Sequence, residues 1–191
     1  ISGTTTVCRD AAFPDVTFTG SLGTPPYTFT YTIDGGSTRT VTTSGGSSVS
    51  VAVPTGTAGE FIYELVSVRD ASSTQCSHAQ SGTAVVRINP LPAANISGST
   101  EVCRYATEPY ITFTGISGTP PYTFTYEVNS GGEQMVTTSG SNSGVSIPVT
   151  TSSTGTFTYV LVSVQDALGC SQTQSGSASV TVNPLPIASI T

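Results

Sequence analysis

The stretch GTPPYTFTY occupies residues 23–31 and recurs letter for letter at residues 118–126, 95 positions further along. The 191 residues therefore consist of two copies of one unit. Within the first copy Tyr27, Phe29 and Tyr31 alternate with threonines, which is the period of a strand with one buried and one exposed face. We expect this segment to be the central strand of each unit.

Other segments of the first copy also alternate apolar and polar residues, and each predicts a short strand. They lie around residues 2–7, through Val16 and Phe18, at 39–43, through Val49 to Val53, at 61–68, and through Ala84 to Ile88. The run FIYELVSV at 61–68 changes phase at Val66, which indicates either a strand covered on both faces or a β-bulge. About seven short strands per unit, frequent turns and no helical period predict an all-β fold of antiparallel β-sandwiches; an up-and-down barrel is the alternative.

The boundaries of the units follow from repeated segments at their ends. ISGTTTVCRD begins at Ile1 and ISGSTEVCRY at Ile96, and each copy ends in NPLP. We expect a first domain at residues 1–92, a second at 93–186 and the start of a third at 187–191, as in a fragment of a longer array. Paired prolines favour extended backbone, so the linkers should be semi-rigid. The linker residues are Asn89, Pro90, Leu91, Pro92, Asn183, Pro184, Leu185 and Pro186.

Composition narrows the class of partner. Charged residues make up only 8% of the chain, lysine is absent, and the net charge is -6. Attraction to nucleic acid or to an anionic membrane surface is therefore not expected. No apolar run approaches the ~20 residues that span a bilayer, so membrane insertion is not expected either. The sequence also has no initiator Met or signal peptide, as expected for a mature fragment.

Two cysteines fall in each copy, Cys8 with Cys76 and Cys103 with Cys170. The duplication favours one bridge inside each copy, which would close a loop of roughly 70 residues and contribute about 4 kcal/mol in the chain-entropy model. Free buried thiols are the alternative. A metal site is disfavoured because no C-x-x-C occurs and His78 is the only histidine. Structural disulfides would place the protein in an oxidising, extracytoplasmic compartment.

Residues suited to catalysis are few. There is no lysine, and His78 has Gln172 as its counterpart in the second copy. A poised nucleophile with a base is not apparent, so we expect no enzymatic activity and no cofactor.

Two further features admit a functional and a structural interpretation. Asp70 and Asp166 follow the long strand of each copy, where a carboxylate caps a turn or binds Ca²⁺; the scarcity of nearby acidic residues favours capping. A threonine face with Thr28, Thr30 and Thr32 would suit ice or carbohydrate, but threonine is also an ordinary residue on exposed strands. Glu127 replaces Thr32 in the second copy and breaks the array.

The order of the motifs resembles that of a known family. The ISG-T-x-x-C start, G-x-PPYTFTY, the VQDALGC segment at 164–170 and the NPLP link are similar to immunoglobulin-like or PKD-like tandem repeats in large secreted proteins of Bacteroidetes, such as gliding-motility adhesins with SprB-type repeats. The resemblance covers nearly the whole chain. It implies tandem immunoglobulin-like sandwiches at the cell surface, exported by the type IX secretion route. VRDASSTQC at 68–76 departs from the pattern by two extra residues.

Together these observations predict an extracellular structural repeat of an adhesin, stalk or filament. Its expected partners are neighbouring repeats of the same chain, other copies in a fibre, and surface glycans contacted by the loops at 37–48 and 130–143. The alternatives are a glycan- or surface-binding module and a spacer attached to a secreted hydrolase.

Overall fold

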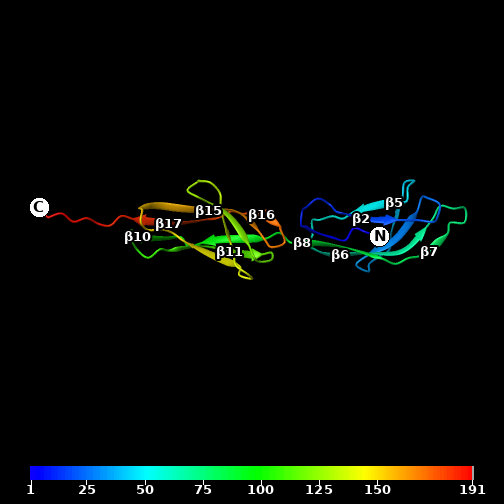
Figure 1. Cartoon of the computed structure of the whole chain (residues 1–191), viewed down its shortest axis with the longest axis horizontal. Helices are drawn as coiled ribbons and strands as arrows, with labels where there is room; N and C mark the ends of the chain where they lie inside the picture. The colour runs from blue at the N-terminus through cyan, green and yellow to red at the C-terminus, as the bar shows by residue number, and fades with distance from the viewer. Residues whose placement is uncertain (191) are drawn as a thin grey trace. The chain divides into compact units, whose positions relative to one another are not determined.

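The computed structural model describes residues 1–190 and contains two compact units, Ile1–Pro90 and a second that begins at Leu91. Every regular element in these residues is a β-strand (Figure 1). The described residues contain no helix of the length and apolar character that crossing a membrane requires. Of the expected third start at 187–191, residues 187–190 form no strand and Thr191 lies outside the described residues.

Each unit contains the predicted strands together with short additional ones. The first unit has β1 (Thr5–Cys8), β2 (Asp15–Thr19), β3 (Thr28–Ile33), β4 (Arg39–Thr42), β5 (Ser48–Ala52), β6 (Gly59–Arg69), β7 (Ser77–Ala79) and β8 (Thr83–Asn89). The second has β9 (Ala93–Ser97), β10 (Thr100–Cys103), β11 (Tyr110–Ser117), β12 (Thr123–Val128), β13 (Gln134–Thr137), β14 (Gly144–Pro148), β15 (Gly155–Gln165), β16 (Ser171–Thr173) and β17 (Ser177–Asn183).

The strands of each unit form two sheets. In the first unit the larger sheet has the order β1-β8-β6-β3-β4, with β7 paired to β6, and the smaller is β2-β5. The second unit repeats this as β10-β17-β15-β12-β13, with β16 on β15, facing β14-β11-β9. The predicted all-β, immunoglobulin-like sandwich is confirmed.

One strand pair in each unit differs from the expected antiparallel arrangement. β1 runs parallel to β8, with Thr5 opposite Val86 and Cys8 opposite Asn89. β10 runs parallel to β17 in the same way. The first strand of each larger sheet therefore lies beside the last and points in the same direction.

Aromatic side chains from the central strand and from the smaller sheet form the core. Tyr27, Phe29 and Tyr31 are all buried, as their alternation predicts. The ring of Phe18 on β2 lies 5.6 Å from that of Phe29 and 5.0 Å from that of Tyr31. Phe113 makes the same two contacts in the second unit, at 5.7 and 4.9 Å. These contacts join the two sheets.

The phase change in FIYELVSV is a β-bulge. The β3–β6 register shifts between Thr30, opposite Ser67, and Tyr31, opposite Leu65, so Val66 has no partner on β3. Val66 is 41% exposed, whereas Val68 returns to the core side. The bulge interpretation is confirmed, because an extra residue moves the next side chain to the opposite face.

The turn before the central strand is built around Tyr27. The Pro25–Pro26 peptide bond is cis, as is Pro120–Pro121. The Tyr27 hydroxyl donates to the carbonyl of Gly23 at 2.7 Å and accepts the Gly23 N–H at 3.0 Å. Gly20 lies against the ring face: a Cβ there would be 2.6 Å from Cγ of Tyr27. Tyr27 thus contacts both ends of the loop GSLG at residues 20–23, through its ring at Gly20 and its hydroxyl at Gly23.

Hydroxyl pairs connect neighbouring strands on the exposed faces. Thr17 pairs with Ser50 at 2.8 Å, and Thr28 with Thr42 at 3.0 Å. Further pairs lie between Thr19 and Ser48, Thr112 and Ser146, Thr123 and Thr137, Thr156 and Thr181, and Thr158 and Ser179. The threonine face is thus part of the hydrogen bonding between strands.

Gly20→Ala should destabilise the first unit by about 2 kcal/mol, because the added methyl overlaps the Tyr27 ring in a packed core. Gly46→Ala is the matched control, since a Cβ at Gly46 meets nothing within 4 Å. Thermal and urea unfolding would measure the difference. Equal stability of the two variants would contradict the packing of glycine against tyrosine.

Candidate functional site

The features that the sequence singles out gather at the two ends of each unit. We define the exit end as the end at which the last strand finishes, at Asn89 in the first unit and Asn183 in the second. The entrance end is the opposite one.

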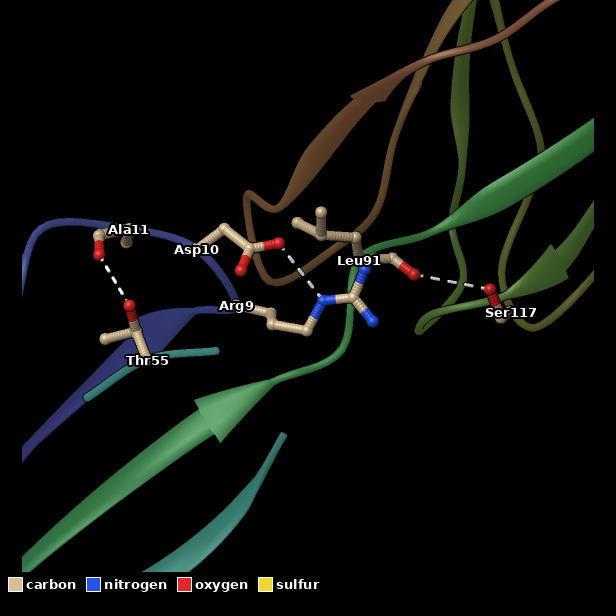
Figure 2. A network of polar contacts seen from close by, with 6 residues as sticks. All are labelled: Arg9, Asp10, Ala11, Thr55, Leu91 and Ser117. Atoms are coloured by element: carbon tan, nitrogen blue, oxygen red, sulfur yellow. Dashed lines mark hydrogen bonds and ion pairs between the residues drawn. The ribbon is translucent and has the colours of Figure 1, made fainter. Parts of the chain in front are cut away.

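The exit end of the first unit holds Cys8. Cys8 lies opposite Asn89 in the parallel pair, and the N–H of Arg9 donates to the carbonyl of Asn89 at 2.8 Å. The chain then turns back, and the hydroxyl of Thr55 donates to the carbonyl of Ala11 at 2.6 Å (Figure 2). Thr55 is fully buried. The cysteine is thereby held at a fixed point beside the last residue of β8.

The exit end of the second unit repeats this arrangement. Cys103 lies opposite Asn183, and the N–H of Arg104 donates to Asn183 at 2.8 Å. Thr151 donates to the carbonyl of Ala106 at 2.7 Å. Thr55 and Thr151 were not predicted from the sequence, although each follows a similar apolar segment, V-x-V-P in the first copy and I-P-V in the second.

The entrance end of the first unit is organised by Asp70. Its N–H donates to the carbonyl of Cys76 at 3.0 Å. One carboxylate oxygen accepts the N–H of Thr24 at 3.1 Å, and the other accepts the hydroxyl of Ser72 at 2.7 Å. These hydrogen bonds, that from the Ser72 hydroxyl most of all, hold the pKa of Asp70 below its ordinary value. Asp70 joins the Cys76 loop to the GTPP turn.

Asp166 does the same in the second unit despite the shorter loop. Its N–H donates to the carbonyl of Cys170 at 3.0 Å, and its carboxylate accepts N–H groups of Thr119, Leu168 and Cys170 at 3.0–3.1 Å. Both aspartates thus cap turns. Within residues 1–190 no group of three or more His, Cys, Asp or Glu side chains is placed to hold a metal ion.

The cysteines do not pair within a copy as expected. β6 runs antiparallel to β8, so Gly59 lies at the exit end with Cys8, and Asp70 lies at the entrance end with Cys76. The backbone from Gly59 to Asp70 extends about 35 Å at ~3.3 Å per residue. A disulfide needs Cα atoms within about 7 Å. An in-copy bridge is therefore excluded in this fold.

The two copies differ in the state of their cysteines. Cys76 and Cys103 are free thiols and both are exposed. Cys8 and Cys170 are disulfide-bonded. Each position of the repeat, early or late, thus occurs once as a thiol and once as a disulfide.

The linker residues are distributed between strands and loops. Asn89 is the last residue of β8, and only Pro90, Leu91 and Pro92 separate it from β9. The hydroxyl of Ser117 donates to the carbonyl of Leu91 at 3.3 Å (Figure 2). The second half of the linker thus packs on the second unit. In the other copy Asn183 ends β17, Pro184, Leu185 and Pro186 follow outside any strand, and Leu185 is 49% exposed.

Two cavities lie in the first unit. One of about 290 Å³ is at the entrance end and is lined by residues that include Leu22, Tyr27, Asp70, Cys76 and His78. The other, of about 560 Å³, is lined by Ile33, Asp34, Arg39, Val53, Pro54, Gly56, Thr57, Phe61 and Tyr63. Burial raises the pKa of the Tyr63 hydroxyl above its ordinary value.

Neither a protein-family model nor a curated protein matches the chain. Among solved structures it is similar to a Ca²⁺-stabilised, ice-binding adhesin of an Antarctic bacterium, with 21% identity and a TM-score of 0.49 over 97% of this chain and 50% of that one. It is also similar to a 1.5-MDa bacterial ice-binding adhesin (20% identity, TM-score 0.46, 90% of this chain and 58% of that one). A third similar structure is a four-repeat segment from the extending region of a large adhesion protein (20% identity, TM-score 0.42, 95% of this chain and 49% of that one). The chain thus spans about half the length of these structures, and its fold is assigned from its own strand order.

Asp70→Asn should make the stability of the first unit less dependent on pH in the acidic range. The folded-state pKa of Asp70 lies below its unfolded value of about 3.9, so the charged carboxylate stabilises the fold above that pH and the benefit is lost as pH falls through the folded pKa. The variant should melt below the wild type at pH 7, and the gap should shrink at pH 3. Glu101→Gln, on an exposed strand position, is the control. A gap of the same size at both pH values would show that Asp70 does not act through its charge.

Proposed function

We propose that this chain is a load-bearing repeat segment of a long extracellular adhesin, stalk or filament. The observation that carries the proposal is the parallel pairing of the first and last strands of each larger sheet. Tension enters a repeat of an array through its two ends. It pulls β1 toward its own start and β8 toward its own end.

Forces of this kind act along the ladder in opposite directions, so they shear it. The registered pairs, Thr5 with Val86 through Cys8 with Asn89, then resist together instead of opening one after another. The second unit has the same device in β10 and β17.

The distribution of sequence between the copies also supports a structural role. The core strand is identical in both, whereas the loops at 37–48 and 130–143 differ. We place the array among SprB-type surface proteins of Bacteroidetes exported by the type IX route, on the order of the motifs described above. Its partners are then neighbouring repeats of the same chain and other copies in a fibre.

A second candidate function is glycan binding at the cavity of about 560 Å³ in the first unit. Its lining includes the aromatic residues Phe61 and Tyr63 and the charged residues Asp34 and Arg39. Arg39 is the first residue of β4 and lies in the segment 37–48, which differs between the copies. An aromatic wall with a few polar groups is typical of small-ligand sites.

A glycan array probed with the chain tests that candidate. Binding should fall about tenfold or more in Arg39→Ala if the cavity is the site, while Arg87→Ala, at an exposed ion pair with Glu60 elsewhere on the unit, should bind as the wild type. Uniform absence of binding would leave only the structural role.

Thr5→Pro should weaken the first unit against force, and Thr6→Pro should not. Arg9 directs its N–H to β8, so the alternate residues Val7 and Thr5 do too, whereas the N–H of Thr6 points away. Proline at residue 5 removes one ladder hydrogen bond, worth about 1 kcal/mol. Single-molecule pulling through the termini measures the unfolding force of each variant.

Equal unfolding forces for the two proline variants would contradict the load-bearing role of β1 and β8. The role also requires the segment to be outside the cell. Antibodies against the chain must therefore label intact cells without permeabilisation.

A further inference from the structure

The two free cysteines lie at unlike ends of their respective units. Cys103 is the last residue of β10, at the exit end of the second unit, and Cys76 precedes β7 at the entrance end of the first. Both are exposed. We propose that these thiols form disulfides with further copies of the repeat, pairing an exit-end cysteine with an entrance-end cysteine.

The bonded state of the corresponding positions points to this chemistry. Cys8 has the same place in the first unit as Cys103 in the second, and Cys8 is disulfide-bonded. Cys170 has the same place as Cys76, and it is disulfide-bonded too. Both positions of the repeat therefore accommodate a disulfide, although the ~35 Å between the ends of one unit excludes a partner in the same unit.

Chain geometry favours pairing between unlike ends. Only Pro90, Leu91 and Pro92 separate the last strand of one repeat from the first strand of the next. Such a link reaches at most about 14 Å. In a row of repeats, an exit end and the following entrance end stay within reach of one another, whereas two exit ends or two entrance ends do not.

The loop that carries Cys76 has room for a partner. The thiol lines the cavity of about 290 Å³ together with Leu22 and His78, and Leu22 is fully exposed at the tip of the GSLG turn. The corresponding residue of the second unit, Ser117, is also exposed, and its hydroxyl donates to the carbonyl of Leu91 at 3.3 Å.

The bond requires an oxidant, which we take to be a low-molecular-weight or protein disulfide. A thiolate of one cysteine attacks this disulfide and forms a mixed disulfide, releasing one thiol. The second cysteine then displaces the other half as a thiol. Two cysteine thiols become one disulfide, and the oxidant is reduced to two thiols.

The test mixes two variants of the full chain, each of which has one free thiol. Cys103→Ser keeps only the free thiol of Cys76, and Cys76→Ser keeps only that of Cys103. Both positions are exposed, so both variants should fold. In a buffer of oxidised and reduced glutathione, the mixed dimer should exceed each symmetric dimer by clearly more than the statistical factor of about two, because an exit end and an entrance end are the pair that meets in a row of repeats. Cys76→Ser/Cys103→Ser should stay monomeric.

Peptide mapping identifies the bond directly. The chain has no Lys, so trypsin cleaves after its Arg residues and places the four cysteines in separate peptides, 1–9, 70–87, 88–104 and 105–191. The oxidised wild-type chain should form linear oligomers in which 70–87 is joined to 88–104.

A statistical mixture of symmetric and mixed dimers would overturn the proposal, as would peptides 70–87 joined to 1–9 or 88–104 joined to 105–191. Monomers that persist with both thiols capped by glutathione would overturn it as well. Each of these results would leave the load-bearing role intact, because that role rests on the β1–β8 and β10–β17 ladders and is measured by force.

Discussion

The sandwich depends on one aromatic ring from the smaller sheet in each unit. The ring of Phe18 lies 5.0–5.6 Å from two rings of the central strand, and that of Phe113 lies 4.9–5.7 Å from the two equivalent rings in the second unit. Offset aromatic contacts of this kind bury large areas and prefer defined geometry. They join the sheets without a core tryptophan or an intersheet disulfide. The core therefore supports itself, and the cysteines are available for the ends of the unit.

The entrance ends of the two units have the same backbone hydrogen bonds although their loop sequences differ. The loop before Cys76 is two residues longer than that before Cys170, yet in both units an aspartate N–H donates to the cysteine carbonyl and its carboxylate holds the GTPP turn. The additional length is absorbed within the loop, where Ser72 supplies a hydroxyl to Asp70. Each unit thus holds its late cysteine at the same backbone position.

Period-2 patterns predicted which residues face the core, and the phase change at Val66 predicted the bulge. They did not predict that β1 pairs in parallel with β8, because alternation describes one strand and carries no information about its neighbour. The cysteine pairing failed for the same reason. Two cysteines in one copy suggest a bridge until the strand directions place Cys8 and Cys76 at opposite ends. Thr55 was missed because its buried hydroxyl acts through a single contact with the carbonyl of Ala11.

The hydroxyl pairs across the strands have a consequence for the medium in which the protein works. Charge–charge attraction is screened as ionic strength rises, with a Debye length that shrinks from about 30 Å at 0.01 M to about 3 Å at 1 M. A hydrogen bond between Thr17 and Ser50, or between Thr123 and Thr137, involves no net charge and is not screened in this way. Most side-chain hydrogen bonds between neighbouring strands are of this kind. The stability of the fold should therefore change little between dilute and strongly saline water.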